Sequence, residues 1–448
     1  MKTVGIIAEY NPFHNGHAHQ ISFLKEQGAE IIVAALSGCF VQRGMPAWTD
    51  KYLRTKMALA QGVDFVFELP VLYALSSAEG FAFGGVSLLN ALPLEGFCFG
   101  SESGKLEQLQ TIADFLVSND KTKHHTGYDI MTEENDSAGC SSSTVFQKEL
   151  QSEMKKGVSF PYAREKALRT VFPDFFQNNP MLVAAPNNIL ALEYLKACRI
   201  LDSKLQPVTL LRNDHGYLET NLEPGTVKAS AMAIRSQYKN HRSLDVIKPS
   251  IPETTYNLLK ENPNRFSLDM NDFSDIVYTC LRREKSPENY TSYGEISPDL
   301  AMRFWKHLPE FTSFWEYSDL IRRKNFTYTR IFRSLMHITL GITKEQLERT
   351  KMKVPYLRLL GMNKEKSAYL RKIKKLPLIT KVADYEKILI GFYEKQDTLS
   401  NAQKQSRISH ALDCFRTDLL AADIYRQTLY HKLGVLLPDE FHNGIEIY

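Results

Sequence analysis

The chain has 448 residues, of which 43% are hydrophobic and 24% are charged. This composition is typical of a folded globular protein, and the length exceeds what one hydrophobic core usually supports, so we expect two or three domains. No stretch is long and apolar enough to span a membrane, and the first apolar run is too short for a secretory signal. The six cysteines include no CxxC pair, which indicates buried thiols in a reducing compartment, so we expect a cytoplasmic protein.

Charge is distributed unevenly along the chain. The net charge is +4, yet residues 321–390 alone contain 18 Lys and Arg against 5 Asp and Glu, a local charge of +13 that leaves −9 for all other residues. A region of this kind is suited to a polyanionic partner.

The first predicted element is a short buried strand that leads into a histidine motif. Residues 4–8 (VGIIA) form a continuous apolar run, and Pro12 ends it because proline cannot donate to a central strand ladder. The sequence His14-Asn15-Gly16-His17 is then typical of a helix start. Two histidines three residues apart project from one face of the first turn, where backbone N–H groups have no intrahelical partner. Gly16 leaves room for a nucleotide beside the backbone.

These features predict a phosphate site for nucleotidyl transfer. Two imidazole donors and a helix N-terminus would stabilise the charge that builds up on an attacked α-phosphate. The alternative is a pair of surface histidines, and the position directly after a hydrophobic strand favours the functional interpretation. A zinc site is disfavoured because His14 and His17 have no Cys or carboxylate set nearby at metal-ligand spacing, and we expect no structural metal.

Strands and helices alternate through the first half of the chain. This alternation predicts an α/β domain with a right-handed, doubly wound parallel sheet. Residues 118–143 are polar and lack a period, so we expect an exposed loop there. The expected strands cover residues 4–8, 30–36, 64–69, 95–99 and 207–211, and the expected helices cover residues 18–27, 50–61, 76–92, 105–117, 145–155, 161–171 and 186–198.

Two further positions carry basic residues that could bind an anion. Arg43 lies between Gly38 and Gly44 in the loop after the second strand, and ligands of open α/β sheets bind at the carboxyl ends of strands. Arg43 could bind a phosphate or a carboxylate, and a solvated loop arginine is an equal alternative. Further on, Ser230 and Arg235 predict a second anion-binding helix start, for which a Ser-capped surface helix is the alternative.

Taken together, these motifs resemble a known family. His14-Asn15-Gly16-His17 followed by Ser230-Ala231-Met232-Ala233-Ile234-Arg235 is similar to the HxGH and ISSTxIR-type pair of the nucleotidyltransferase superfamily with class I synthetase-like catalytic cores. More narrowly, GIIAEYNPFHNGH, SGCFVQRGMPA, FELP, FGSE and Ala185-Pro186-Asn187 resemble, in this order, the bacterial tRNA(Met) cytidine acetate ligase family. The resemblance continues through Tyr328-Thr329-Arg330 and residues 356–361 (YLRLLG) and covers nearly the whole chain.

The resemblance implies an ATP-dependent ligase. Members of this family activate acetate to acetyl-adenylate and transfer the acetyl group to N4 of the wobble cytidine of elongator tRNA(Met), which gives N4-acetylcytidine. Such chemistry requires groups that clamp phosphates but no nucleophilic side chain. ATP is the expected substrate, and Mg²⁺ would accompany it, held mainly by the phosphates and by water. Arg43 then becomes a candidate contact for acetate or phosphate.

The resemblance also implies the residues of the ATP site, with His14 and His17 as the catalytic pair. Ala231 and Met232 stand where the superfamily motif has Ser-Thr, which removes a hydroxyl contact to phosphate beside Ser230 and Arg235. The segment that corresponds to the family's ATP-binding stretch is Ile7, Ala8, Glu9, Tyr10, Asn11, Pro12, Phe13, His14, Asn15, Gly16, His17, Ala18, His19 and Gln20, and the other implied contacts are Gly100, Asn187, Arg212, Ser230 and Arg235.

A second, mainly helical domain is expected after prolines interrupt the pattern in residues 240–263. We therefore divide the chain into a nucleotidyltransferase-like catalytic domain, residues 1–245, and a basic tRNA-binding domain, residues 246–448. Its expected helices cover residues 268–283, 299–306, 311–323, 328–340, 365–374 and 403–430.

Clustered basic side chains in this second domain predict contacts to RNA phosphates, with solvated helix faces as the alternative. Tyr328, Tyr356 and Tyr369 lie between them and could stack on bases. The predicted phosphate contacts are Arg322, Arg323, Lys324, Arg330, Arg333, Arg371, Lys372, Lys374 and Lys375.

Two other functions fit parts of the chain. A small-molecule adenylyltransferase would need only the HxGH core, and the basic helical region disfavours it. A non-catalytic RNA-binding protein would need only that basic region, and the intact His14 and His17 disfavour it. The expected partners are therefore elongator tRNA(Met), acetate and ATP, and no membrane.

Overall fold

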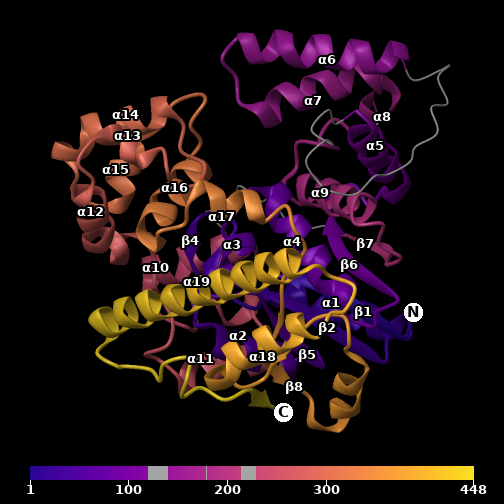
Figure 1. Ribbon diagram of the computed structural model, residues 1–448, viewed down its shortest axis with the longest axis vertical. Coiled ribbons are helices and arrows are strands. Elements are labelled where there is room, and N and C mark those ends of the chain that lie inside the picture. Colours follow the sequence, from indigo (N-terminus) through magenta and orange to yellow (C-terminus); the bar gives the residue numbers. More distant parts are fainter. Residues whose placement is uncertain (120–139, 178, 213–228) are drawn as a thin grey trace.

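Five parallel strands form the centre of the fold (Figure 1). The structure, a computed structural model, describes residues 1–119, 140–177, 179–212 and 229–448. The spatial order is β5-β2-β1-β6-β7, and all neighbours in it are parallel. The chain adds β2 and β5 on one side of β1 and then β6 and β7 on the other, which confirms the doubly wound sheet and puts its switch point between β1 and β6. The strands are β1 (Thr3–Ala8), β2 (Ile31–Ser37), β5 (Phe65–Leu69), β6 (Gly96–Ser101) and β7 (Gln206–Leu211).

Helices cover both faces of this sheet. Alternate side chains of β1 point to opposite faces, so that Val4 and Ile6 pack toward α1 while Ile7 packs toward α4. A Cβ placed on Gly85 of α4 would lie 2.7 Å from Ile7 Cδ1, so glycine permits the close approach. The helices are α1 (Asn15–Glu26) and α2 (Lys51–Ala60) on one face, and α4 (Ala78–Ala91) and α9 (Pro186–Ile200) on the other.

The C-terminal region adds strands to the same sheet, which the sequence patterns did not lead us to expect. β8 (Leu357–Met362) pairs antiparallel with β5, and β9 (Leu378–Ile379) and β10 (Glu446–Ile447) each pair parallel with β8. The helix expected at residues 365–374 is instead a 3₁₀ segment, η5 (Lys364–Lys372). Residues 246–448 therefore complete the edge of a sheet that begins in residues 1–245.

Helices dominate the rest of the described chain, as expected for its second half. α6 begins at Cys140, inside the expected 118–143 loop, and most of that loop, residues 120–139, lies outside the described residues. The remaining α-helices and strands are α3 (Val71–Ala74), β3 (Phe40–Val41), β4 (Met45–Pro46), α5 (Leu106–Ser118), α6 (Cys140–Lys155), α7 (Phe160–Val171), α8 (Pro173–Gln177), α10 (Ala231–His241), α11 (Glu253–Glu261), α12 (Ser274–Arg283), α13 (Pro287–Tyr290), α14 (Pro298–His307), α15 (Phe314–Ile321), α16 (Tyr328–Leu340), α17 (Lys344–Arg349), α18 (Tyr385–Glu394) and α19 (Asn401–Leu433). Across the ranges described, no helix has the length and apolar character to cross a membrane.

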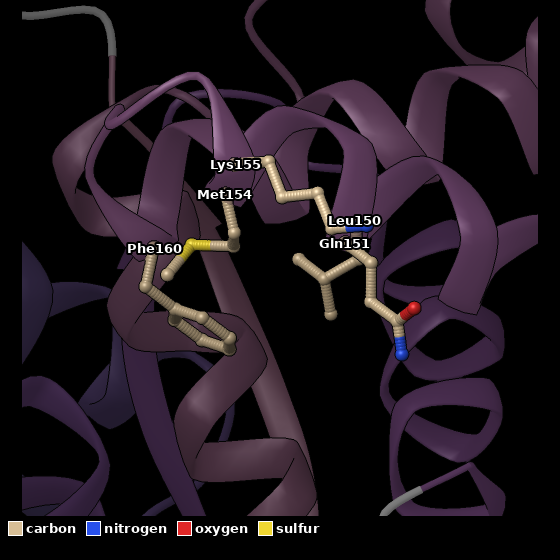
Figure 2. Close-up of a pocket in the computed structure, with 5 residues that line it drawn as sticks. All are labelled: Leu150, Gln151, Met154, Lys155 and Phe160. Atoms are coloured by element: carbon tan, nitrogen blue, oxygen red, sulfur yellow. The ribbon is translucent and has the colours of Figure 1, made fainter.

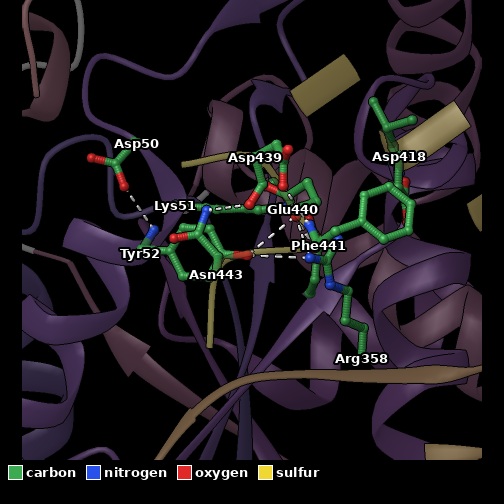
Figure 3. A network of polar contacts seen from close by, with 12 residues as sticks. Asp50, Lys51, Tyr52, Arg358, Asp418, Asp439, Glu440, Phe441 and Asn443 are labelled. Carbon is green, nitrogen blue, oxygen red and sulfur yellow. Dashed lines mark hydrogen bonds and ion pairs between the residues drawn. The ribbon is translucent and has the colours of Figure 1, made fainter. Parts of the chain in front are cut away.

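A buried network of charges joins the C-terminal segment to the sheet (Figure 3). Lys51 Nζ lies 2.8 Å from both Glu68 Oε1 and Glu440 Oε2. Arg358 of β8 forms ion pairs with the same two carboxylates, at 2.9 Å from Glu68. All four side chains are less than 9% exposed. Two cations and two anions thus balance in the interior, where an unpaired charge would be costly.

Candidate active site

The two motif histidines replace the usual capping side chains at the start of α1. His14 is the N-cap residue, and its Nδ1 accepts the Gly16 N–H at 3.1 Å. His17 Nδ1 in turn accepts the His14 N–H at 3.2 Å, which completes a capping box. Because both Nδ1 atoms accept backbone hydrogens, each neutral ring carries its proton on Nε2. The rings stack with centroids 3.7 Å apart, so two Nε2–H donors lie side by side at a helix N-terminus.

The surroundings of His17 keep its ring neutral. Burial lowers the pKa of His17 well below its ordinary value, and the nearby charges of His14 and Arg212 lower it further. Tyr10 and Phe13 cover the ring, with centroids 4.8 and 5.4 Å away. A neutral His17 imidazole near pH 7 acts here as a hydrogen-bond donor through Nε2, and it can stabilise negative charge that develops in front of it.

Three of the five nucleotide contacts implied outside the motif, Gly100, Asn187 and Arg212, come together beside this pair. Arg212 Nη1 donates to Asn187 Oδ1 at 3.2 Å. A Cβ on Gly100 would lie 2.6 Å from Arg212 Cδ, and one on Gly16 would lie 3.9 Å from Arg212 Nη2. The guanidinium therefore bridges from the end of β6 to the start of α1. This is the switch point of the sheet, where open α/β folds bind nucleotides.

Glu102 fixes the position of Asn187. Its carboxylate accepts the Asn187 side-chain amide at 2.7 Å and the backbone N–H groups of Asn187 and Asn188 at 3.1 and 2.9 Å. These N–H groups open α9, so the carboxylate occupies the favourable end of a helix dipole. The FGSE segment noted in the sequence contains both Gly100 and this anchoring carboxylate.

A second group of charged residues lies on the β2 side of the histidines. Burial lowers the pKa of Arg43, and it lowers the pKa of Arg235 to about 10. The negative charge of Glu9 partly offsets this effect for both arginines. Glu9 Oε1 accepts the Gln42 N–H at 3.0 Å, which ties the Arg43 loop to the end of β1. Arg235 Nη1 donates to the Asn11 carbonyl. Arg43, Arg235 and Glu9 thus form a polar cluster where β1 and β2 end.

Several other predicted residues of the ATP site have structural roles. Ser230 caps α10 by accepting the Ala233 N–H at 3.2 Å, so it stands at the predicted helix start. Gln20 donates to the Cys98 carbonyl at 3.2 Å, and Asn15 donates to the Pro249 carbonyl at 2.8 Å. Five more residues of the predicted ATP-binding segment are buried in the core or pack against it: Ile7, Ala8, Tyr10, Phe13 and Ala18. His19 is exposed.

Arg54 is a residue that sequence reasoning missed. Its side chain is fully buried in α2, and it donates to four backbone carbonyls at the carboxyl edge of the sheet. Nε donates to Thr49 at 2.9 Å, Nη1 donates to Glu9 and Ser37 at 2.8 Å each, and Nη2 donates to Gly38. One guanidinium therefore holds together the loops that follow β1 and β2. An arginine in a helix carries no sequence signal for such a position, because the acceptors come from distant segments.

The predicted RNA contacts separate into different environments. Arg333 forms an ion pair with Glu295 at 2.7 Å, and Arg330 donates to the Glu295 carbonyl at 3.3 Å. Both guanidinium groups are therefore engaged within the protein. Arg322, Arg323 and Lys324 are exposed in the turn before α16.

The other predicted cluster, Arg371 to Lys375, lies at the opposite edge of the sheet. Lys375 Nζ donates at 2.8 Å to the carbonyl of Asn90, near the C-terminal end of α4. The η5 segment follows the end of β8 that pairs with the first residue of β5. This is the amino edge, about 17–20 Å from the carboxyl edge along a strand. Arg371, Lys372, Lys374 and Lys375 are all exposed there.

The prediction that Tyr356 and Tyr369 stack on bases is wrong. Tyr356 is 0% and Tyr369 is 3% exposed, and their hydroxyls bond to Asp418 and to the Pro93 carbonyl. Both lie within or beside β8 and η5, so their rings fill the core that the unexpected strand creates. Tyr328, by contrast, lies at the surface at the start of α16.

An open groove elsewhere shares no residue with this site. Figure 2 shows it between α6 and α7, lined mainly by the apolar parts of Leu150, Met154 and Phe160. Figure 1 shows this pair of helices at the periphery of the molecule. It lacks the cluster of polar donors that the histidine site has, so we assign the nucleotide to the carboxyl edge of the sheet.

Known proteins with similar sequences and folds match most or all of the chain. The family model described as HIGH Nucleotidyl Transferase matches residues 1–136 and 133–433. The tRNA(Met) cytidine acetate ligase of Lysinibacillus sphaericus is 36% identical over 86% of this chain and 90% of that protein. The one from Thermoanaerobacter pseudethanolicus is 35% identical over 96% of each. The crystal structure of Thermotoga maritima TmcAL bound with alpha-thio ATP has a TM-score of 0.83 and 28% identity, covering 100% of this chain and 99% of that one.

Proposed function

The chain belongs to the HIGH nucleotidyl transferase family and to the tRNA(Met) cytidine acetate ligases, and on that premise we propose that it uses ATP to attach acetate to a cytidine of tRNA(Met). The observation that carries the proposal is the stacked His14–His17 pair beside Arg212 at the switch point of the sheet. Both imidazoles donate through Nε2, and the guanidinium supplies positive charge. This arrangement suits an attacked phosphate and includes no side chain that must become acylated.

In the first step, a carboxylate oxygen of acetate attacks the α-phosphorus of ATP. The bond from this phosphorus to the bridging oxygen breaks, pyrophosphate leaves, and acetyl-adenylate forms. His14 and His17 donate to the non-bridging oxygens as their charge grows, and Arg212 binds the phosphates next to them. Mg²⁺ would enter with ATP, held mainly by its phosphates and by water.

In the second step, the exocyclic N4 amine of the wobble cytidine attacks the acetyl carbonyl. The bond between the carbonyl carbon and the AMP oxygen breaks, AMP leaves, and the amine loses one proton to give N4-acetylcytidine. We assign Arg43 to acetate, because its partly buried guanidinium belongs to the loop after β2 and is close enough to Glu9 and Arg235 to feel their charges.

We divide the chain into a catalytic part, residues 1–245, and an RNA-binding part, residues 246–448, joined through one sheet. The exposed Arg322, Arg323 and Lys324 are the best placed of the basic residues to meet RNA near the site, because α16, which follows them, contacts the Gln42–Gly44 loop. A tRNA substrate implies work in the cytoplasm, where the reduced cysteines are also expected.

The test is a product assay with matched histidine variants. Protein, ATP, isotope-labelled acetate and unmodified tRNA(Met) are incubated, and the nucleosides are examined by mass spectrometry for labelled N4-acetylcytidine. His14→Asn, which retains a capping side chain, and His17→Ala should each lower acetyl-adenylate formation about 10²–10³-fold, with a smaller effect on ATP binding. His431→Ala, at an exposed position of α19, is the control.

Two results would contradict the proposal. Unchanged turnover in both histidine variants would remove the pair from the mechanism. Acetate-independent transfer of AMP to a small phosphorylated substrate, with no labelled nucleoside, would favour a small-molecule adenylyltransferase instead.

A further inference from the structure

Three planar side chains form a stack at the surface where α15 and α16 meet. Trp315 of α15 lies against Tyr328 of α16 with ring centroids 5.1 Å apart and planes 20° from parallel. The guanidinium of Arg322 lies 4.5 Å from the centre of the Tyr328 ring. Trp315 remains 44% exposed, which is unusual for so large an apolar side chain. The protein therefore presents an aromatic face to solvent next to a cation.

Neighbouring residues hold this stack in a fixed geometry. The Tyr328 hydroxyl donates to Asp319 at 2.5 Å and accepts from Arg322 Nη1 at 3.3 Å. Phe332 packs beneath, with centroids 5.8 Å from Trp315 and 5.7 Å from Tyr328. The tyrosine hydroxyl is thus satisfied within the protein. Binding of a ligand that stacks on this surface would cost the protein little side-chain entropy, because its rings are already ordered.

The charge around the stack favours an anionic ligand. Arg322, Arg323 and Lys324 are consecutive and exposed, and the nearby Asp319 carboxylate already accepts the tyrosine hydroxyl. An apolar peptide would gain from the aromatic face but not from three cations. A nucleotide gains from both, since its base can stack and its phosphate can meet a guanidinium or an ammonium group.

The helix below the stack leads directly to the candidate active site. Arg333 comes five residues after Tyr328 in α16, a rise of about 7.5 Å. Its Nη1 lies 3.5 Å from the Gln42 carbonyl, and a Cβ on Gly44 would lie only 2.4 Å from the Arg333 nitrogen. These contacts involve the loop that carries Arg43. The stack and the Arg43 loop are therefore connected by one rigid element, α16.

We propose that Trp315, Tyr328 and Arg322 form a binding surface for an unpaired base of the RNA substrate, close to the base that is modified. The inference rests on the proposed function, because it assumes that the acceptor is RNA. Single-stranded loops are the usual targets of such surfaces, since their bases are free to stack on aromatic rings. The anticodon loop of a tRNA offers such bases beside the wobble position.

The experiment compares RNA binding by three variants. Trp315→Ala should weaken binding of an anticodon stem-loop about 5- to 150-fold, as expected for the loss of one base stack. Trp315→Phe should restore most of the affinity. Met302→Ala removes another exposed side chain, 53% exposed on the neighbouring α14, and should bind as the wild type does. Because Trp315 makes no phosphate contact, the salt dependence of binding should keep its slope in all three.

Two controls separate the stacking role from other causes. A fully paired RNA hairpin of the same charge should bind wild type and Trp315→Ala equally. Acetate-dependent ATP turnover without RNA should be unchanged in Trp315→Ala, which also shows that the variant is folded. Equal loss for both RNAs, or wild-type binding of the stem-loop by Trp315→Ala, would overturn the inference. If the wild-type protein itself bound no RNA, the proposed function would fail and this inference with it.

Discussion

The buried charge network predicts a large loss of stability from a substitution that preserves shape. Glu440→Gln keeps the size of the side chain but removes one of two carboxylates that balance Lys51 and Arg358. Glu68 would then be the remaining anion beside two buried cations. The interior would carry a net positive charge, and neither cation could be rehydrated without opening the contact between the C-terminal segment and the sheet.

The expected magnitude follows from the burial of these groups. Removing one partner of a buried ion pair typically lowers the free energy of unfolding by about 3–5 kcal/mol. Burial alone would raise the pKa of Glu440, but the charges of Arg358 and Lys51 outweigh it and lower this pKa to about 2. Since the folded-state pKa is below the ordinary 4.5, the carboxylate stabilises the fold above about pH 4.5 and loses this contribution as the pH falls toward 2.

The assay is urea unfolding at pH 7 together with hydrogen exchange. Glu440→Gln should shift the unfolding midpoint to lower urea, and the amides of β10 should exchange faster because their anchor is weakened. Glu386→Gln is the matched control, since Glu386 pairs with Arg416 at the surface, where ion pairs contribute little. If Glu440→Gln unfolded at the midpoint of this control, the network would not join the C-terminal segment to the sheet in the way we describe.

Two further predictions concern neighbouring buried groups. Burial, and next the charge of Glu68, raise the pKa of Asp418 to about 7, above its ordinary 3.8. Between these two pKa values the folded state holds a proton that the unfolded chain has lost, so the free energy of unfolding should fall as the pH rises from about 4 to 7. Asp418→Asn should make it depend less on pH, which unfolding curves measured across that range would show. Arg54→Lys keeps the charge, but a lysine cannot donate to all four carbonyls as the planar guanidinium does. We expect the free energy of unfolding to fall by about 1.5–3 kcal/mol for each hydrogen bond lost, and the KM for ATP or acetate to rise. Unchanged KM values in a destabilised protein would limit Arg54 to a role in folding.

The sequence predicted the parts of the molecule that local pattern controls. The run from Val4 to Ala8, the histidine motif and the capping Ser230 all lie where expected, because strand ends and helix starts are defined by neighbouring residues. The family resemblance added Gly100, Asn187 and Arg212, which no period or spacing could have connected. Their contact across the ends of β6, β7 and α9 agrees with a common ligand, although they are far apart in sequence.

Long-range pairing explains what the sequence did not reveal. Residues 356–361 are apolar enough for a strand, but their partner is β5, almost 300 residues earlier by sequence number, and nothing local indicates that pairing. The same strand buries Tyr356 and brings Arg358 to Glu68, so one unrecognised pairing led to the wrong prediction for a tyrosine and concealed the buried network.

The position of this network bears on how the two halves of the chain cooperate. A Cβ on Gly38 would lie 2.3 Å from Glu68 Oε1, so the carboxylate that binds Lys51 and Arg358 also supports the start of the Arg43 loop. Arg333 supports the other end of that loop through Gln42. The loop between β2 and α2 thus rests on residues from both halves. Residues 246–448 therefore do more than bind RNA in our proposal, because they complete the surface on which acetate would be positioned.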